Sequence, residues 1–328
     1  MLRPVTASTV EAPNPLARTR KGSDRAGDLV LYGLTALAAL LGLIVILAII
    51  WRVADGAWPA MKAFNISFIW HNDWNVATNK FGARDLIIGT VVTSFGAILI
   101  SAPLSIAIAL FLSELAPPSI RGPIGTLIDR LAAVPSVVVG LWGIFVLAPF
   151  DAQHVQPILG KTLGWIPFFA HGQDKVESTV FTAIVVLTIM TIPITSSICR
   201  ELFLGVPQEL EEASLGLGAT RWEMVKTVVV PTVRGGVVAA IILGLGRALG
   251  EAIAVTQVIG NFIPLKLSLL EPGDTLASRV ANQYQGATTN IQISSLIYLA
   301  FILLAITFIS NFAAQRVVKR FELQRRGG

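Results

Sequence analysis

Residues 212–231 read EASLGLGATRWEMVKTVVVP, a stretch that carries the stop signal of one helix and the start signal of the next. Pro207 upstream suits the first position of a helix, and Glu211 and Glu212 place negative charge in its first turns, where the helix macrodipole favours it. Gly218 predicts the stop, because glycine enters the left-handed backbone region at low cost. The sequence therefore predicts a short helix that ends in a sharp turn.

A second helix is expected directly after this turn. Thr220 and Glu223 have the spacing of a capping box, in which each side chain bonds the other residue's backbone N–H at a helix start. Residues 225–230 are mostly apolar and lead to Pro231. We expect a helix–turn–helix knob fixed to an apolar segment, through which the motion of a partner could reach that segment.

The composition identifies the apolar segments as membrane spans. The chain has 328 residues, of which 54% are hydrophobic and only 14% charged, with a mean hydropathy of +0.71. Soluble domains carry about 25% charged residues, so a soluble globular protein is excluded. We expect an all-α integral membrane protein with about six transmembrane helices. The predicted spans are 29–53, 86–112, 124–149, 179–204, 225–259 and 291–318.

Lysine and arginine predict which ends of the spans face the cytoplasm. Fourteen lie in the 1–28 arm, the 113–123 turn, the 200–226 loop and the tail, against seven in the loops of the opposite face. The positive-inside rule therefore predicts cytoplasmic termini, a flexible N-terminal arm (1–28), a cytoplasmic coupling loop (205–223) and a cytoplasmic tail (319–328). External loops are expected at 54–84, 150–177 and 260–288. The basic pI of 9.6 follows from this topology and does not call for nucleic acid.

The sequence offers no chemistry of a resident enzyme. Cys199 is the single cysteine, and His71, His154 and His171 lack the spacing of a metal site. No G-x-x-x-x-G-K-[ST] phosphate loop occurs, so an ATP-driven function requires a partner. We predict no catalytic residue, no bound metal and no cofactor on this chain.

Two charges inside the fifth predicted span are the candidate substrate site. Arg247 and Glu251 are four residues apart in GLGRALGEAIAV, which places both on one face of a continuous helix. Ionisable residues in a membrane span are costly and mark a pathway or a paired cluster. Arginine offers two parallel donors to an oxyanion. A self-neutralising ion pair is the alternative interpretation.

Other features of the spans and loops have less specific interpretations. Thr188, Thr191 and Thr195 share one face of the fourth span, where they either line a pathway or bond neighbouring helices. Proline interrupts three spans, which suits kinked and movable helices. Aromatic residues crowd the first external loop, as an interface belt or as a docking surface for a soluble partner. The prolines are Pro103, Pro135 and Pro193, and the aromatic residues include Trp58, Phe64, Phe68, Trp70 and Trp74.

The 212–231 stretch resembles the cytoplasmic EAA loop of bacterial ABC importer permeases, Glu-Ala-Ala-x-x-x-Gly-x9-Ile-x-Leu-Pro. Ser214, Val228 and Val230 are conservative departures from that pattern. In such permeases the loop seats in a cleft of the ATPase, a role that the resemblance assigns here to Glu212, Ala213 and Gly218.

Residues 134–150 (VPSVVVGLWGIFVLAPF) and 244–261 (GLGRALGEAIAVTQVIGN) resemble the C-type permease subunits of bacterial phosphate-specific ABC importers. The resemblance covers nearly all of 29–320. It implies a type I importer fold in the bacterial cytoplasmic membrane and a phosphate-translocating role for Arg247 and Glu251. The implied partners are a sister A-type permease, two ATP-binding subunits that carry the ATP and Mg, and an extracytoplasmic phosphate-binding protein.

Three alternatives remain open at the level of sequence. The first is a permease for another tetrahedral oxyanion, such as sulfate or molybdate. The second is a secondary transporter or channel without an ATPase, which the 212–231 loop disfavours. The third is a membrane-embedded enzyme, for which the sequence holds no nucleophile–base or metal constellation.

Overall fold

The computed structural model describes the backbone of residues 22–170 and 176–326, and the side chains of 27–170 and 176–316. Its contacts divide the chain into two compact units, residues 1–52 and 53–328. Most of the predicted N-terminal arm (1–28) therefore lies outside the described residues. The first helix, α1 (Gly22–Phe64), begins before the predicted start of the first span.

Six helical stretches in the described residues are long and apolar enough to cross a membrane. They are Gly27–Ile69, Arg84–Leu115, Ser136–Leu163, Val180–Leu204, Arg221–Gly250 and Asn290–Arg316. The expected number of spans is thus confirmed, and three of the six, the second, fourth and sixth, begin and end within a few residues of the prediction. The first and third have different bounds, and the fifth ends at Gly250, nine residues before the predicted end at 259.

The third span starts later than predicted because the chain breaks at Pro135. A separate helix, α3 (Pro118–Ala132), ends before it, and α4 (Ser136–Trp142) begins after it. Proline lacks a backbone N–H and disfavours the helical conformation in the preceding residue, which favours a break between the two helices here. Pro103 and Pro193, in contrast, lie inside continuous helices, α2 (Arg84–Leu110) and α7 (Val180–Leu204).

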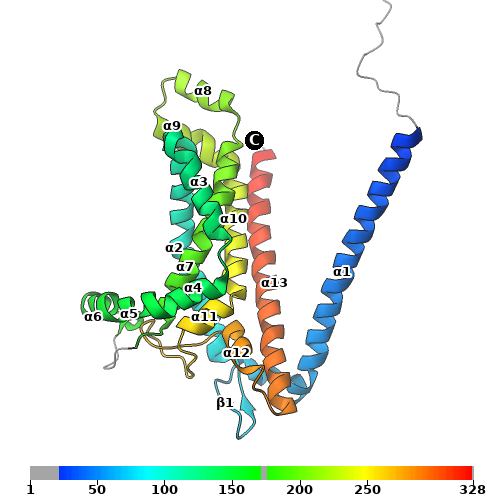
Figure 1. Cartoon of the computed structure of the whole chain (residues 1–328), viewed down its shortest axis with the longest axis vertical. Coiled ribbons are helices and arrows are strands. Elements are labelled where there is room, and N and C mark those ends of the chain that lie inside the picture. The colour runs from blue at the N-terminus through cyan, green and yellow to red at the C-terminus, as the bar shows by residue number, and fades with distance from the viewer. Residues whose placement is uncertain (1–21, 171–175, 327–328) are drawn as a thin grey trace, which may run out of the picture. The chain divides into compact units, whose positions relative to one another are not determined.

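Residues 53–328 form a helical bundle around α7. Helix α7 packs against α2 and α10 (Val230–Gly250), and α10 packs against α13 (Asn290–Arg326) (Figure 1). The candidate span on α7 is 61% buried, more than any other span. The short helices α8 (Gln208–Gly216) and α9 (Arg221–Met224) lie at one end of this bundle, and α12 (Leu276–Gln283) lies at the opposite end (Figure 1).

The α12 end contains more regular structure than the loops predicted there. Besides α12 it includes an antiparallel hairpin of β1 (Trp74–Asn75) and β2 (Lys80–Phe81), which pairs Trp74 with Phe81. The short elements of the whole described chain that have not yet been named are η1 (Asn65–Ile69), η2 (Phe111–Leu115), η3 (Gly143–Leu147), α5 (Ala148–Phe150), η4 (Asp151–Val155), α6 (Gln156–Leu163), η5 (Pro167–Phe169), η6 (Val225–Val229) and α11 (Ile253–Val258).

Aromatic residues of the predicted first loop contribute to the core at this end. Phe68 is fully buried and stacks on Tyr298, with ring centroids 4.5 Å apart. Phe64 packs against the same cluster, whereas Trp70 is 71% exposed. The interpretation of the whole group as one interface belt is therefore wrong: part of it holds the fold together.

Candidate functional site

The coupling segment, which comprises α8, α9 and the turn between them, has the predicted helix, turn and helix. Helix α8 begins at Gln208. Pro207 is therefore the N-cap residue, whereas the prediction made it the first residue of the helix. It ends at Gly216, and Gly218 has φ +90°. The N–H of Gly218 bonds the carbonyl of Leu215 at 2.9 Å, and that of Ala219 bonds the carbonyl of Ser214 at 3.3 Å. These two bonds form a Schellman motif, the helix ending in which a left-handed glycine satisfies the last carbonyls.

The second helix of the segment starts with the predicted capping box. The Glu223 carboxylate accepts from the Thr220 N–H at 2.8 Å, and the Thr220 hydroxyl accepts from the Glu223 N–H at 3.3 Å. Arg221 donates to the carbonyl of Glu114 at 3.3 Å, which ties the segment to η2, the continuation of α2 at the end of the second membrane span.

The surface of the coupling segment is open to a partner. Glu212, Ala213 and Gly218 are all exposed, and α8 has no buried residue. Leu217 is 90% exposed and Trp222 is 70% exposed. Partial burial raises the pKa of Glu211, and the nearby carboxylates of Glu114 and Glu212 raise it further. An acidic, partly apolar knob of this kind is suited to a protein interface.

Arg247 projects into an apolar cavity on the flank of the bundle. The cavity has a volume of about 330 Å³ and takes its walls from α3, α4, α7 and α10. Its described lining residues are Leu131, Ala132, Val134, Val138, Val139, Trp142, Ile189, Met190, Pro193 and Arg247, so Arg247 is the one ionisable group among them. The Nε of Arg247 is buried without a hydrogen-bond partner in the described part of the chain. A buried guanidinium nitrogen without a partner favours the binding of an anionic ligand.

Glu251 does not share a helix with Arg247, so the predicted common helix face is wrong. Helix α10 ends at Gly250, and Glu251 has an extended backbone with ψ 115°. Its carboxylate instead accepts from the N–H of Ala254 at 3.3 Å, at the start of α11. None of the ion pairs between described residues joins Arg247 to Glu251. The self-neutralising pair is therefore not present, and Glu251 supports the break between two helices.

The threonines of α7 face the interior of the bundle. Thr188 and Thr191 bond the carbonyls of Ile184 and Leu187, four residues earlier, at 2.8 and 2.6 Å. Thr195 lies against Gly244, where a Cβ would come within 2.8 Å of its hydroxyl oxygen. Gly244 therefore permits the close approach of α10 to α7, and these threonines do not line the Arg247 cavity.

A buried ionic cluster at the α12 end was not predicted. Asp274 and Arg279 lie 2.6 Å apart, Oδ2 to Nε, with side chains only 1% and 7% exposed. Burial raises the pKa of Asp274 to about 6, against the opposing charge of Arg279. Trp74 lies 5.6 Å from the Arg279 guanidinium and donates its indole N–H to Gln283 at 2.7 Å. We call Trp74, Asp274, Arg279 and Gln283 the clasp.

The clasp connects the hairpin to the helix break. Gly273, next to Asp274, donates its N–H to the carbonyl of Ile259 at 2.9 Å. Ile259 directly follows α11, which begins two residues after Glu251. Trp74 is therefore a structural residue rather than a free docking side chain. No local sequence signal marks the clasp, because its members are brought together by contacts between distant segments.

These features define a multi-pass membrane protein with an exposed helix–turn–helix segment at one end of its bundle. Residues 103–323 match the family described as "Binding-protein-dependent transport system inner membrane component", and the chain belongs to this family. It is 40% identical to the phosphate transport system permease protein PstC of Pasteurella multocida, over 93% of this chain and 96% of that protein. It is 43% identical to the PstC protein of Haemophilus influenzae, over 83% of this chain and 87% of that protein.

Solved structures confirm the fold of type I ABC importer permeases. A chain of the bacterial alginate ABC transporter, solved in complex with its alginate-bound periplasmic protein, matches with a TM-score of 0.56 at 19% identity. The match covers 90% of this chain and 98% of that one. A second structure of a bacterial alginate importer gives a TM-score of 0.53 at 18% identity, over 88% of this chain and 99% of that one.

Proposed function

We propose that this chain is a transmembrane permease subunit of an ATP-driven importer of inorganic phosphate in the bacterial cytoplasmic membrane. The observation that carries the proposal is the 40% identity to a phosphate transport system permease over 93% of the chain. The proposed partners are a sister A-type permease, two ATP-binding subunits that hold ATP and Mg, and an extracytoplasmic phosphate-binding protein. The α8 end and both termini face the cytoplasm in this proposal.

The coupling segment transfers the motion of the ATPase to the spans. The ATP-binding subunit binds the exposed α8 around Glu212 and Ala213, and the turn at Gly218 fixes the angle between α8 and α9. Because α9 continues through η6 into α10, and Arg221 bonds η2 at the end of the second span, closure of the ATPase tilts two spans together. Alternating access follows when this tilt opens one end of the pathway and closes the other.

Arg247 supplies the positive charge that the passing phosphate meets. Its surroundings are apolar, so a guanidinium–oxyanion bond is stronger there than in water. Glu251 holds the break between α10 and α11, and only its Oε1 has a hydrogen-bond partner among the described residues. Its Oε2 is left to accept a hydrogen bond from a protonated phosphate oxygen. Fully ionised sulfate lacks such a donor, which gives the site a basis for selectivity.

The test is uptake by the assembled complex in vesicles. We expect ATP-dependent phosphate uptake that requires the binding protein and that excess sulfate or molybdate does not inhibit. The double variant Arg247→Leu with Glu251→Leu should assemble and hydrolyse ATP, yet take up almost no phosphate. Uptake near the wild-type rate in this variant would show that these two residues are not the transport site. Preferred uptake of sulfate or molybdate would reject phosphate as the substrate.

A further inference from the structure

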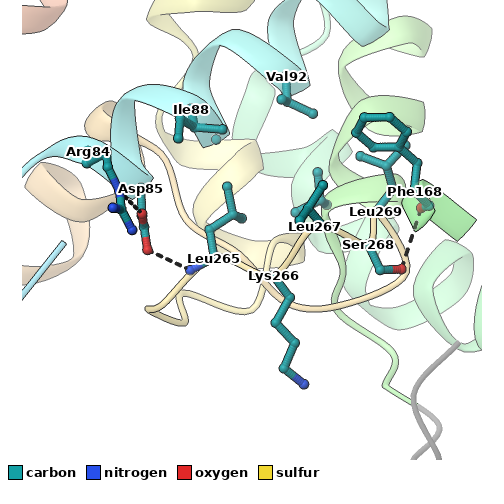
Figure 2. Close-up of a pocket in the computed structure, with 12 residues that line it drawn as sticks. Arg84, Asp85, Ile88, Val92, Phe168, Leu265, Lys266, Leu267, Ser268 and Leu269 are labelled. Carbon is teal, nitrogen blue, oxygen red and sulfur yellow. Dashed lines mark hydrogen bonds and ion pairs between the residues drawn. The ribbon is translucent and has the colours of Figure 1, made fainter. Parts of the chain in front are cut away.

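A second cavity, of about 300 Å³, lies at the α12 end of the bundle, away from Arg247. Its walls come from the start of α2, from Phe168 and Val180, and from the irregular segment 265–269 (Figure 2). The lining includes Ile88, Val92, Leu265, Leu267 and Leu269, so most of its surface is apolar. A bare inorganic anion gains nothing from such walls, whereas a hydrocarbon chain does.

The position of this cavity along α2 matches the depth profile of a bilayer. The span that contains α2 runs from Arg84 to Leu115 and has 32 residues, more than the ~20 that cross the hydrocarbon layer. Arg84, its first residue, therefore falls in the headgroup region. Ile88 and Val92 follow on the same helix face, one and two turns deeper, over about 12 Å. Going deeper into the membrane, the cavity wall thus changes from a cationic residue to apolar residues. A phospholipid changes in the same direction from its charged headgroup to its acyl chains.

The cavity also opens onto an apolar surface of the same helix. Ile88 is 44% exposed, and farther along this side of α2 Phe95 is 50% and Leu99 is 79% exposed. A chain of this composition exposes such residues to hydrocarbon rather than to water. A lipid chain can therefore enter the cavity from the bilayer without crossing a polar surface.

One cation at the rim has donors to spare. The Nε of Arg84 bonds Asp85 at 3.1 Å, and the other Asp85 oxygen accepts from the N–H of Leu265 at 2.9 Å (Figure 2). The two terminal nitrogens of Arg84 have no partner among the described residues, and its side chain is 46% exposed. Lys266 points away from the cavity (Figure 2). Its ammonium group donates to the Glu271 carboxylate at 3.0 Å.

We propose that this cavity is a binding site for one membrane phospholipid. The phosphodiester accepts hydrogen bonds from the terminal nitrogens of Arg84, and one acyl chain lies along Ile88 and Val92 beneath Leu267. The site lies against segment 265–269, which in the sequence comes after the helix break at Glu251 and before Asp274 of the clasp. A bound lipid would therefore brace this segment, at a place distinct from the proposed phosphate site.

The test compares lipid retention in variants of the assembled complex. The complex is washed in detergent until bulk phospholipid is removed, and native mass spectrometry counts the lipids that remain. We expect Val92→Trp, which fills the cavity, to retain one phospholipid fewer per copy of this chain than the wild type. Leu99→Trp, on the same face of α2 but outside the cavity, should retain the wild-type number. Equal retention by wild type and Val92→Trp would overturn the proposal.

A second measurement does not depend on the folding of a cavity variant. Phosphatidylglycerol added to the washed wild-type complex should restore the bound lipid and raise the thermal midpoint. Diacylglycerol with the same acyl chains, which lacks the phosphate, should bind about tenfold more weakly, and Arg84→Gln should remove this difference. Equal binding of the two lipids would refute the role of Arg84. Displacement of the lipid by inorganic phosphate would identify the cavity as an anion site instead.

Discussion

The two ends of the bundle are built on opposite principles. The coupling segment at the α8 end is exposed, and its turn and its second helix start are shaped by bonds between residues within five positions of each other, as at Gly218 and Thr220. The clasp at the α12 end is centred on the buried Asp274–Arg279 pair, and its part-buried Trp74–Gln283 bond joins residues 209 positions apart. The first arrangement keeps its shape while its surface remains available to a partner. The second fixes several loops to one another. The comparison therefore distinguishes a segment whose surface is available for binding from a cluster that stabilises the fold.

The largest effect on stability is expected from the clasp. Arg279→Leu leaves the carboxylate of Asp274 buried without a counter-charge, which costs about 3–5 kcal/mol. Lys266→Gln is the matched control, because its ion pair with Glu271 has a lysine that is 58% exposed, and such pairs contribute about 0–1 kcal/mol. Thermal unfolding of the purified complex distinguishes the two. A midpoint of Arg279→Leu equal to that of the control would contradict an anchoring role.

A smaller effect is expected at the two tryptophans of the same loop. Trp74→Phe removes the donor to Gln283 at a part-buried position, at a cost of about 1–3 kcal/mol. Trp70→Ala changes an exposed side chain and should leave the thermal midpoint within the error of the wild type. If Trp70 contacts the binding protein, this variant should lose only the stimulation of ATPase activity by that protein. Equal destabilisation by both changes would show that the clasp assignment is wrong.

The smallest effect on stability, with a large effect on activity, is expected in the coupling segment. Gly218→Val forces a β-branched residue to φ +90°, where no neighbour would clash with its Cβ, so the cost is backbone strain of about 1–2 kcal/mol. Gly216→Ala lies in the helical part of α8, also with open space around a Cβ, and serves as control. We expect Gly218→Val to lose ATPase stimulation by loaded binding protein, and Gly216→Ala to keep it. Normal stimulation and uptake in Gly218→Val would separate this turn from coupling.

The same contrast explains what the sequence could predict. The turn at Gly218 and the capping box at Thr220 depend on residues a few positions apart, so local rules predict them correctly. The break after Gly250 has no proline to mark it, and a helix through Glu251 is the natural local expectation. The apolar pattern alone places Pro135 inside the third predicted span, although it separates α3 from α4. The clasp depends on tertiary contacts that no local pattern contains.

The exposed surface of the coupling segment also bears on how such a subunit must be made. Leu217 and Trp222 are 90% and 70% exposed, on a knob whose proposed environment is the aqueous cytoplasm. In the proposed complex an ATP-binding subunit covers these side chains. Without that subunit they would make the chain prone to aggregation and a target for proteolytic quality control. We therefore expect the cellular abundance of this chain to follow the supply of its ATPase, so that synthesis without that partner yields degradation rather than surplus permease.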